Sequence, residues 1–294
     1  MKSPIFTGSS AAVITPFKGG RIDYDALKRI IDLQKIAGTS ALTVCGTTGE
    51  ASTLKREERF AAVAFAKAFS GEIPVIAGTG SNSTEQTVTL SQDAEKAGAD
   101  ALLIVTPYYN KSTQNGLIEH YFRVADSVSI PIIAYNVPSR TGLSFKPETY
   151  LELSKHPNIN GVKEASGDFA LVVRTLSLCG EDFNIWSGND DIIVPMMSLG
   201  AKGIISVAAN IIPGVIARVA SLCSADRYAE AAKIQIKYSK LISLLFSEVN
   251  PIPVKAAMHS LGLCEDEFRL PLTKMTEQNR SALYSEMQAL MLLK

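Results

Sequence analysis

Short apolar runs, rich in small and β-branched residues, recur along this chain at a nearly regular interval. There are eight runs, and the last residue of each lies 20 to 32 residues before the last residue of the next. One strand followed by one helix takes about this much chain, and continuous apolar runs are typical of buried parallel strands. The eight runs are Ala11–Thr15, Ala41–Cys45, Ile73–Ala77, Ala101–Val105, Pro131–Tyr135, Ile159–Lys163, Phe183–Ser187 and Gly203–Val207.

The segments between these runs carry helical patterns. Leu27, Ile30 and Ile31 follow the spacing of one helix face. Ser83 followed by Gln86 predicts a capping box at the start of another helix. A second apolar stripe comprises Phe60, Val63 and Ala64. The remaining signals are N-cap residues and prolines suited to a first helical turn, namely Asp23, Asp168, Asn189, Pro147 and Pro213.

Eight strand–helix units predict an α/β protein in which residues 1–225 form a (β/α)8 TIM barrel. The regular interval ends after the eighth unit, and helical patterns near 226–248, 254–261 and 276–293 predict a small C-terminal helical appendage over residues 226–294. A doubly wound sheet is the alternative, and it usually has a glycine-rich phosphate loop after its first strand. The nearest candidate, 78–83, has only the first two glycines of that pattern and follows the third strand. We therefore expect no dinucleotide site.

The charge balance excludes several classes of partner. The chain has 294 residues, with 29 Lys and Arg against 29 Asp and Glu, so its formal net charge is zero. Binding to nucleic acid or to an anionic membrane surface needs clustered excess basic residues. The longest stretches without charge, 3–17 and 203–217, have 15 residues each. A membrane-spanning helix needs about 18 or more apolar residues, so we expect no membrane span.

The cysteines and histidines indicate neither a disulfide framework nor a metal site. The four cysteines are spread along the chain and no two form a C-x-x-C motif. No histidine lies four residues from another or beside a cysteine cluster, so we expect no metal ligands and no cofactor. We expect His120, His156 and His259 at the surface or at helix ends. The N-terminus lacks the apolar segment of a signal peptide, and we expect a reduced, cytoplasmic protein.

The active site of a (β/α)8 barrel lies at the carboxyl ends of its strands, and Lys163 ends the sixth expected strand. An amine in a partly dry site is a nucleophile that forms imines with ketones. The residue pattern alone equally allows a lysine that reaches solvent and pairs with a carboxylate. Strand alternation places Lys163 and Glu164 on opposite faces of the strand.

Three further features at the strand ends each have a functional and a structural interpretation. The hydroxyl of Tyr135 can relay protons, or the ring can simply fill the core. The glycine-flanked turn Thr47–Thr48 can bind a small carboxylate through N–H and hydroxyl groups, or it can be an ordinary polar turn. Arg140 can bind a carboxylate through two hydrogen bonds, or it can be a surface arginine.

Eight motifs give the sequence a family resemblance. It resembles the pyruvate-dependent class I aldolases, the superfamily of N-acetylneuraminate lyase, and within it the dihydrodipicolinate synthase family. The motifs run in order over nearly the whole chain. They are GTTGE at 46–50, AGTGSN at 77–82, TPYYN at 106–110, YNVPSRTG at 135–142, VKEASG at 162–167, SGND at 187–190, GIISVAAN at 203–210 and NPIPVK at 250–255.

The resemblance implies a Schiff-base reaction without metal or organic cofactor. Lys163 would form an imine with pyruvate, and the derived enamine would attack the aldehyde of L-aspartate 4-semialdehyde, a step of diaminopimelate and lysine biosynthesis. Tyr135 and Thr47 would relay protons together with Tyr109, which the family lends from a neighbouring subunit. The resemblance therefore implies an oligomer, and we expect a homotetramer built as a dimer of dimers.

The resemblance also implies substrate contacts. Thr48 would hold the pyruvate carboxylate, and Arg140 would bind the carboxylate of the second substrate. Gly188 and Ile205 would line the pocket through their backbone. Asn189 stands where an acidic residue is common in the family, so no carboxylate role is expected there.

Two alternative functions follow from the same resemblance. Sister lyases that cleave sialic acid or keto-deoxy sugar acids share the lysine and the tyrosine, but the Thr47–Thr48 pair and Arg140 favour the synthase. A catalytically silent homologue acting as a sensor is disfavoured because all the expected catalytic residues are present.

Many members of the family are inhibited by lysine at a site between subunits. Asn82 and Tyr108 match two residues of that regulatory site. The positions that depart from lysine-sensitive members are Ala51, Arg56, Arg59 and Gln86. The two arginines would repel a cationic ligand, so we predict weak or absent inhibition by lysine.

Overall fold

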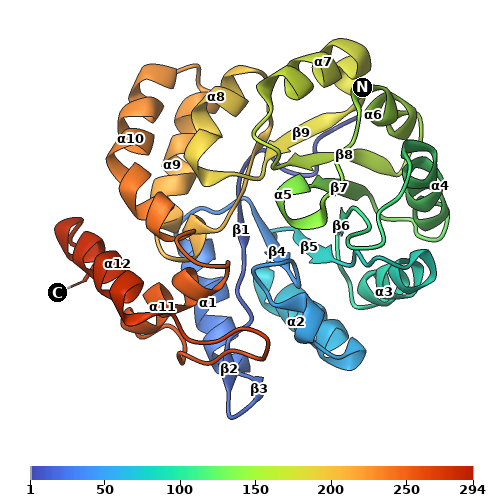
Figure 1. Ribbon diagram of the computed structural model, residues 1–294. Coiled ribbons are helices and arrows are strands. Elements are labelled where there is room, and N and C mark those ends of the chain that lie inside the picture. The colour runs from blue at the N-terminus through green and yellow to red at the C-terminus, as the bar shows by residue number, and fades with distance from the viewer. Residues whose placement is uncertain (1, 294) are drawn as a thin grey trace.

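A closed barrel of eight parallel strands forms the centre of the computed structural model, which describes residues 2–293 (Figure 1). The strand order is β1-β10-β9-β8-β7-β6-β5-β4, and pairing of β1 with β4 closes the ring. The predicted fold class is therefore confirmed. The barrel strands are β1 (Gly8–Ala12), β4 (Ala41–Val44), β5 (Val75–Gly78), β6 (Ala101–Val105), β7 (Ile132–Asn136), β8 (Ile159–Glu164), β9 (Asn184–Ser187) and β10 (Gly203–Ser206).

Helices surround the barrel as an outer layer. The long ones are α1 (Tyr24–Ile36), α2 (Arg56–Ser70), α3 (Thr84–Lys96), α4 (Gln114–Ala125), α6 (Pro147–Ser154), α7 (Phe169–Cys179) and α9 (Pro213–Ser224). Shorter helical turns are η1 (Ala51–Thr53), α5 (Pro138–Thr141), η2 (Gly180–Asp182), η3 (Asp190–Ile192), α8 (Ile193–Ser198) and η4 (Ala208–Asn210). Asp23 and Asp168 cap α1 and α7 as predicted, since each carboxylate accepts a hydrogen bond from the N–H three residues on.

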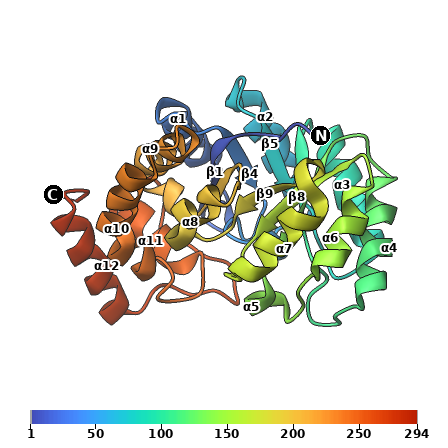
Figure 2. The same ribbon diagram turned by 90° about the horizontal axis from the view of Figure 1, so that it is seen from above.

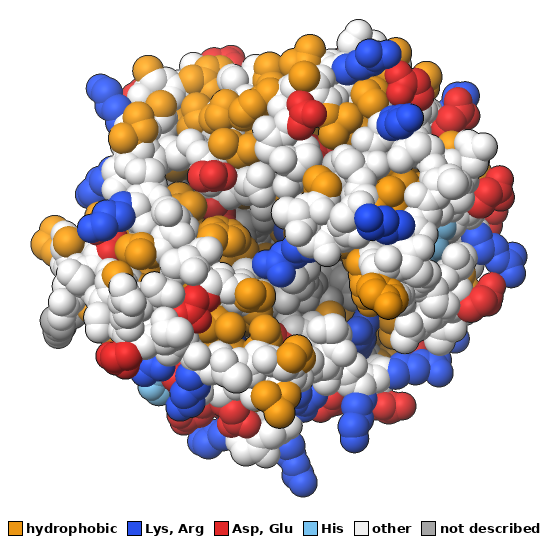
Figure 3. Space-filling model, in the orientation of Figure 1, with side chains coloured by type: hydrophobic (Ala, Val, Ile, Leu, Met, Phe, Trp, Pro, Cys, Tyr) orange, Lys and Arg blue, Asp and Glu red, His pale blue; other side chains and the backbone are white. Residues whose placement is uncertain are grey.

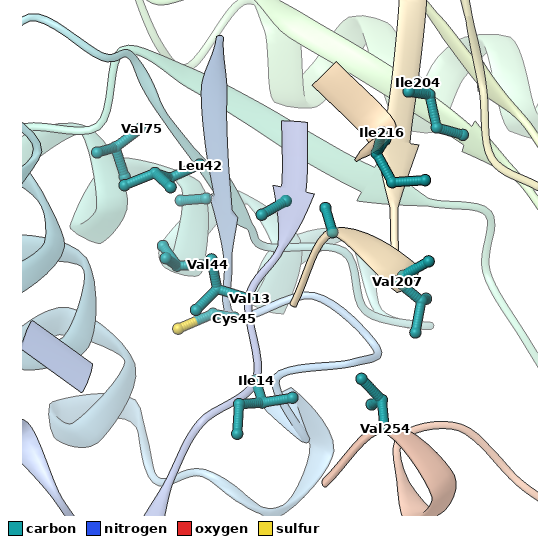
Figure 4. Close-up of a cluster of buried hydrophobic side chains, with 14 of the residues drawn as sticks. Val13, Ile14, Leu42, Val44, Cys45, Val75, Ile204, Val207, Ile216 and Val254 are labelled. Atoms are coloured by element: carbon teal, nitrogen blue, oxygen red, sulfur yellow. The ribbon is translucent and has the colours of Figure 1, made fainter. Parts of the chain in front are cut away.

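The first strand lies three residues before its predicted place. The strand ends at Ala12, and the Val13 and Ile14 side chains pack in the apolar cluster outside the barrel (Figure 4). An apolar run can continue from a strand into this outer layer, so hydrophobicity alone does not mark the strand's end. A small hairpin, β2 (Phe17–Lys18) and β3 (Arg21–Ile22), follows and was not expected. Its two turn residues are glycines with positive φ, as this tight turn requires.

Four local expectations are wrong. The Phe60 side chain is 42% exposed and does not share the buried stripe of α2. The Asn189 side chain caps no helix, and Gln86 accepts from the Ser81 hydroxyl instead of completing the capping box. His120 is buried in α4, where its Nδ1 lies 2.9 Å from the Thr84 hydroxyl. Burial lowers the pKa of His120 to about 4.

Two apolar clusters divide the core, because alternate strand residues face opposite sides of the barrel wall. The larger cluster fills the space between strands and helices, and Figure 4 shows part of it. The smaller one lies inside the barrel and contains Tyr135, Trp186 and Ile205. Phe6 stacks on Trp186, and the indole N–H donates to the Phe6 carbonyl at 3.1 Å. The barrel interior is therefore a packed core, not a pore.

The C-terminal helices are α10 (Tyr228–Leu244), α11 (Ile252–Ser260) and α12 (Glu277–Ala289), each within its predicted stretch to within two residues. They lie on one side of the barrel, and α3, α4 and α6 lie on the other (Figures 1 and 2). α10 packs against α8 and α9, and α12 packs against α10 and α11. No helix in the described part of the chain is long and apolar enough to cross a membrane.

Candidate active site

Lys163 and Tyr135 are direct neighbours across two adjacent strands. Residue pairing aligns Tyr135 of β7 with Lys163 of β8. The Lys163 ammonium nitrogen lies 4.4 Å from the centre of the tyrosine ring. The two residues are only 5% and 7% exposed, respectively. The structure thus brings the predicted nucleophile and the predicted proton relay together in a nearly dry environment.

A cavity of about 180 Å³ opens in front of this pair. Figure 3 shows a hollow near the middle of this face of the molecule, with a blue Lys or Arg side chain at its edge. The lining of the 180 Å³ cavity includes Lys163 and Tyr135. It also includes the predicted residues Thr47, Thr48, Arg140 and Gly188. The lining contains no Asp or Glu among the described residues. With only basic charged groups around it, the cavity suits small carboxylate ligands.

A second cavity of about 210 Å³ adjoins the first and shares Thr47, Tyr135 and Arg140 with it. Its lining also includes Tyr108 and Arg59. The Arg59 guanidinium donates to the Ala51 carbonyl and has no carboxylate partner within residues 2–293. The two adjoining cavities are therefore lined by three basic side chains, Lys163, Arg140 and Arg59.

Two buried carboxylates hold the strand ends from outside the cavity. Glu164 faces away from Lys163, as predicted, and accepts hydrogen bonds from Asn136 at 2.9 Å and Tyr150 at 2.8 Å. Asp190 accepts from two backbone N–H groups at the end of β10, at 3.0 and 3.1 Å. Burial raises the pKa of both carboxyls. These supporting roles were not predicted from the sequence, although both residues lie within motifs that carry the family resemblance.

Side chains from the C-terminal helical region brace the Thr47–Thr48 turn. The Asn250 amide donates to the Thr48 hydroxyl at 2.9 Å. The Lys255 ammonium lies 2.5 Å from a Glu50 carboxylate oxygen, and both side chains are fully buried. Burial lowers the pKa of Lys255 more strongly than the neighbouring Glu50 charge raises it. Asn250 and Lys255 were not predicted as site residues either, although they begin and end the NPIPVK motif at 250–255.

Of the other two predicted pocket residues, Gly188 and Ile205, only Gly188 lines the cavity. A Cβ on Gly188 would lie 3.1 Å from the Lys163 side chain and 2.7 Å from that of Ala165, so a glycine is needed there. Ile205 is fully buried inside the barrel and does not belong to the cavity lining.

Three residues expected in the site or its regulation are not gathered in the central cavity. The Tyr109 side chain is 90% exposed, its φ is +69°, and it lines neither cavity. Tyr108 lines only the adjoining cavity. Asn82 lines neither cavity, and its carbonyl accepts a hydrogen bond from Asn110. Among residues 2–293, no group of three or more metal-binding side chains is present.

A (β/α)8 barrel with a buried lysine beside a tyrosine at adjacent strand ends defines a class of enzyme. This chain is a Schiff-base-forming lyase of the class I aldolase type. It belongs to the dihydrodipicolinate synthetase family, whose family model matches residues 5–290. The family resemblance noted in the sequence is thereby confirmed.

Individual relatives match over nearly the whole chain. The chain is 50% identical over 285 residues to the 4-hydroxy-tetrahydrodipicolinate synthase of Alkaliphilus oremlandii (strain OhILAs), covering 97% of this chain and 98% of the relative. Its structure is similar to dihydrodipicolinate synthase from Aquifex aeolicus, with a TM-score of 0.96, 44% identity, and coverage of 98% and 99%. It is also similar to the chloride-inhibited dihydrodipicolinate synthase from Acinetobacter baumannii complexed with pyruvate, with a TM-score of 0.95, 40% identity, and coverage of 98% and 99%.

Proposed function

We propose that this chain condenses pyruvate with L-aspartate 4-semialdehyde, as a step of diaminopimelate and lysine biosynthesis. The observation that carries the proposal is the Lys163–Tyr135 pair inside a cavity whose only charged groups are basic. Relatives at about half identity are named for this synthase activity, and one similar structure holds pyruvate. These relatives weigh against a sugar-acid lyase and against a silent sensor.

The Lys163 amine attacks the ketone carbon of pyruvate, and loss of water leaves an imine. The imine draws electrons from the methyl group, which loses a proton and becomes an enamine carbon. That carbon forms a bond with the aldehyde carbon of the second substrate, and the aldehyde oxygen takes up a proton. The amine of the second substrate then attacks the imine carbon, releases the Lys163 amine and closes the ring. Tyr135, Thr47 and Tyr109 carry the protons between these atoms.

Carboxylate recognition is divided between two places in the cavity. Thr48 and the N–H groups of its turn bind the pyruvate carboxylate, next to Lys163. Arg140 on α5 binds the carboxylate of the semialdehyde, since guanidinium groups pair with carboxylates through two hydrogen bonds. Gly188 contributes backbone to the pocket wall, next to the Lys163 side chain.

We propose a homotetramer arranged as a dimer of dimers, in which Tyr109 completes the site of a neighbour. The 90% exposure of its ring supports this role, because the ring does not line its own chain's cavity. Two exposed apolar side chains on α7, Phe169 and Val173, support a second kind of contact. The oligomeric state is measured by analytical ultracentrifugation, and a monomer with full activity would contradict the arrangement.

We propose that lysine inhibits this enzyme weakly or not at all. Arg56 pairs with Asp93, so its charge is largely compensated. Arg59 has no such partner in the described part of the chain, and it lines the adjoining cavity together with Tyr108. Repulsion of lysine at the regulatory site that the resemblance implies therefore depends mainly on Arg59. Asn82, the other residue of that site, lies two residues after Gly80, which also lines this cavity.

Borohydride trapping tests the proposed chemistry. Reduction in the presence of pyruvate should add mass to the peptide that contains Lys163, and the Lys163→Met variant should show no adduct. Lys255 is a buried lysine outside the cavity and provides the matched internal control, since its peptide should stay unmodified. Turnover with aspartate semialdehyde is then compared with cleavage of sialic acid. Activity on the sugar acid alone would reject the proposal.

A further inference from the structure

We infer that Asn250 is a positioning residue that directs the Thr48 hydroxyl toward the carboxylate of bound pyruvate. The inference deepens the proposed function and rests on the carboxylate role given there to Thr48. It assigns a part in substrate binding to the C-terminal helical region, although the helices of that region lie outside the barrel.

The contact is direct and buried. Asn250 lies between α10 and α11 and is 6% exposed. Its amide nitrogen donates to the Thr48 hydroxyl oxygen at 2.9 Å. Asn250, Thr48 and Lys163 all line the same cavity of about 180 Å³. Asn250 therefore acts at the wall of the substrate site and not in a remote part of the core.

The chemistry of a threonine hydroxyl gives this contact a direction. A hydroxyl has one proton to donate and two lone pairs that accept. Because Asn250 donates to one lone pair, the only proton of Thr48 remains free for another acceptor. The Thr48 hydroxyl has no other hydrogen-bond partner within the described residues. A carboxylate in the cavity is the acceptor that forms the strongest hydrogen bond with this proton.

A second observation marks Asn250 as part of the site. Its amide oxygen is buried and has no hydrogen-bond partner in the described part of the chain. Buried polar atoms without partners are rare in folded proteins and each calls for an explanation. An asparagine that only stabilises the core would be expected to use its amide oxygen as an acceptor. Asn250 instead lines a ligand cavity, and its amide oxygen is unpaired.

The turn that carries Thr48 is held independently of any ligand. Glu50, two residues on, is bound by Lys255 of α11, which lies five residues after Asn250. The Thr15 hydroxyl donates to the Gly49 carbonyl at 2.6 Å. The distance between Asn250 and Thr48 is therefore fixed from both sides, so the hydroxyl is oriented before pyruvate arrives.

A double-mutant cycle tests the inference through pyruvate kinetics. Asn250→Ala should raise the pyruvate KM about tenfold, equivalent to about 1.4 kcal/mol of binding, with a much smaller effect on kcat. Thr48→Val should raise it at least as much. The double variant should match Thr48→Val alone, because Asn250 acts through the hydroxyl that this change removes. The nearly isosteric Asn250→Asp should raise KM further, since a carboxylate there takes the Thr48 proton and repels pyruvate.

Asn184→Ala is the matched control, because Asn184 is also a buried asparagine, and its amide donates hydrogen bonds to residues at the opposite end of the strands. It should lower stability without changing the pyruvate KM. An unchanged KM in Thr48→Val would overturn the carboxylate role and the inference with it. A raised KM in Thr48→Val with no change in Asn250→Ala and Asn250→Asp, or multiplied effects in the double variant, would overturn the inference alone.

Discussion

Breaking the buried Glu50–Lys255 pair should cost the protein a large part of its stability. Both side chains are fully buried, and the Lys255 ammonium also donates to the Glu267 carbonyl at 2.8 Å and lies 4.3 Å from the centre of the Phe17 ring. Lys255→Met keeps most of the apolar stem but leaves the Glu50 carboxylate without its counter-charge. Removing one partner of a buried pair costs about 3 to 5 kcal/mol.

That loss is large against a typical total stability of about 5 to 15 kcal/mol. For a chain of this length it corresponds to a fall in the melting temperature of about 5 to 8 °C, from the usual entropy of unfolding per residue. The double variant Glu50→Gln/Lys255→Met removes both charges and should recover much of the loss, because no charge is then left buried. The loss of stability in Lys255→Met therefore comes mainly from the uncompensated Glu50 charge, and not from the lost attraction itself.

Urea unfolding measures the difference, and Trp186 is a convenient probe because it is the single tryptophan and lies inside the barrel. Lys155→Met is the control, since it removes an exposed pair with Glu152 and should cost about 0.5 kcal/mol or less. A Lys255→Met variant within about 1 kcal/mol of the wild type, or a double variant as unstable as the single one, would show that the buried Glu50 charge does not carry this cost.

Three further predictions concern the relay, the regulation and the pH dependence. Tyr109→Phe should lower kcat about 10²-fold, and mixing it with Lys163→Met subunits should restore activity if the tyrosine serves a neighbour, whereas no recovery would place the relay within one chain. Lysine at micromolar concentration should leave the initial rate unchanged, and measurable inhibition there would contradict the part given to Arg59. Burial lowers the pKa of His120 from 6.5 to about 4, so the unfolded chain binds a proton first as the pH falls. The stability due to neutral His120 is complete above pH 6.5 and declines toward pH 4, by up to about 3 kcal/mol. His120→Phe should flatten that decline in urea unfolding, and equal slopes for both proteins would argue against it.

Features that depend on neighbours along the chain were predictable from the residues alone. The interval between apolar runs was enough to predict eight strands and their helices, because each strand–helix unit is a local pattern. Helix starts at Asp23 and Asp168 were also predictable, since a cap bonds to an N–H three residues away. Strand alternation placed Lys163 and Glu164 on opposite faces of their strand for the same reason.

The contacts between distant segments became known from the three-dimensional fold. Asn250 and Thr48 are 202 residues apart, and their hydrogen bond forms because the C-terminal region folds back onto the second strand end. The burial of His120 and the exposure of Tyr109 likewise depend on which elements pack around them. Hydrophobic spacing reports which face of an element is buried, but it carries no information on the partner that covers that face. The barrel and its lysine were therefore predictable, whereas the residues that brace the substrate turn became visible only in three dimensions.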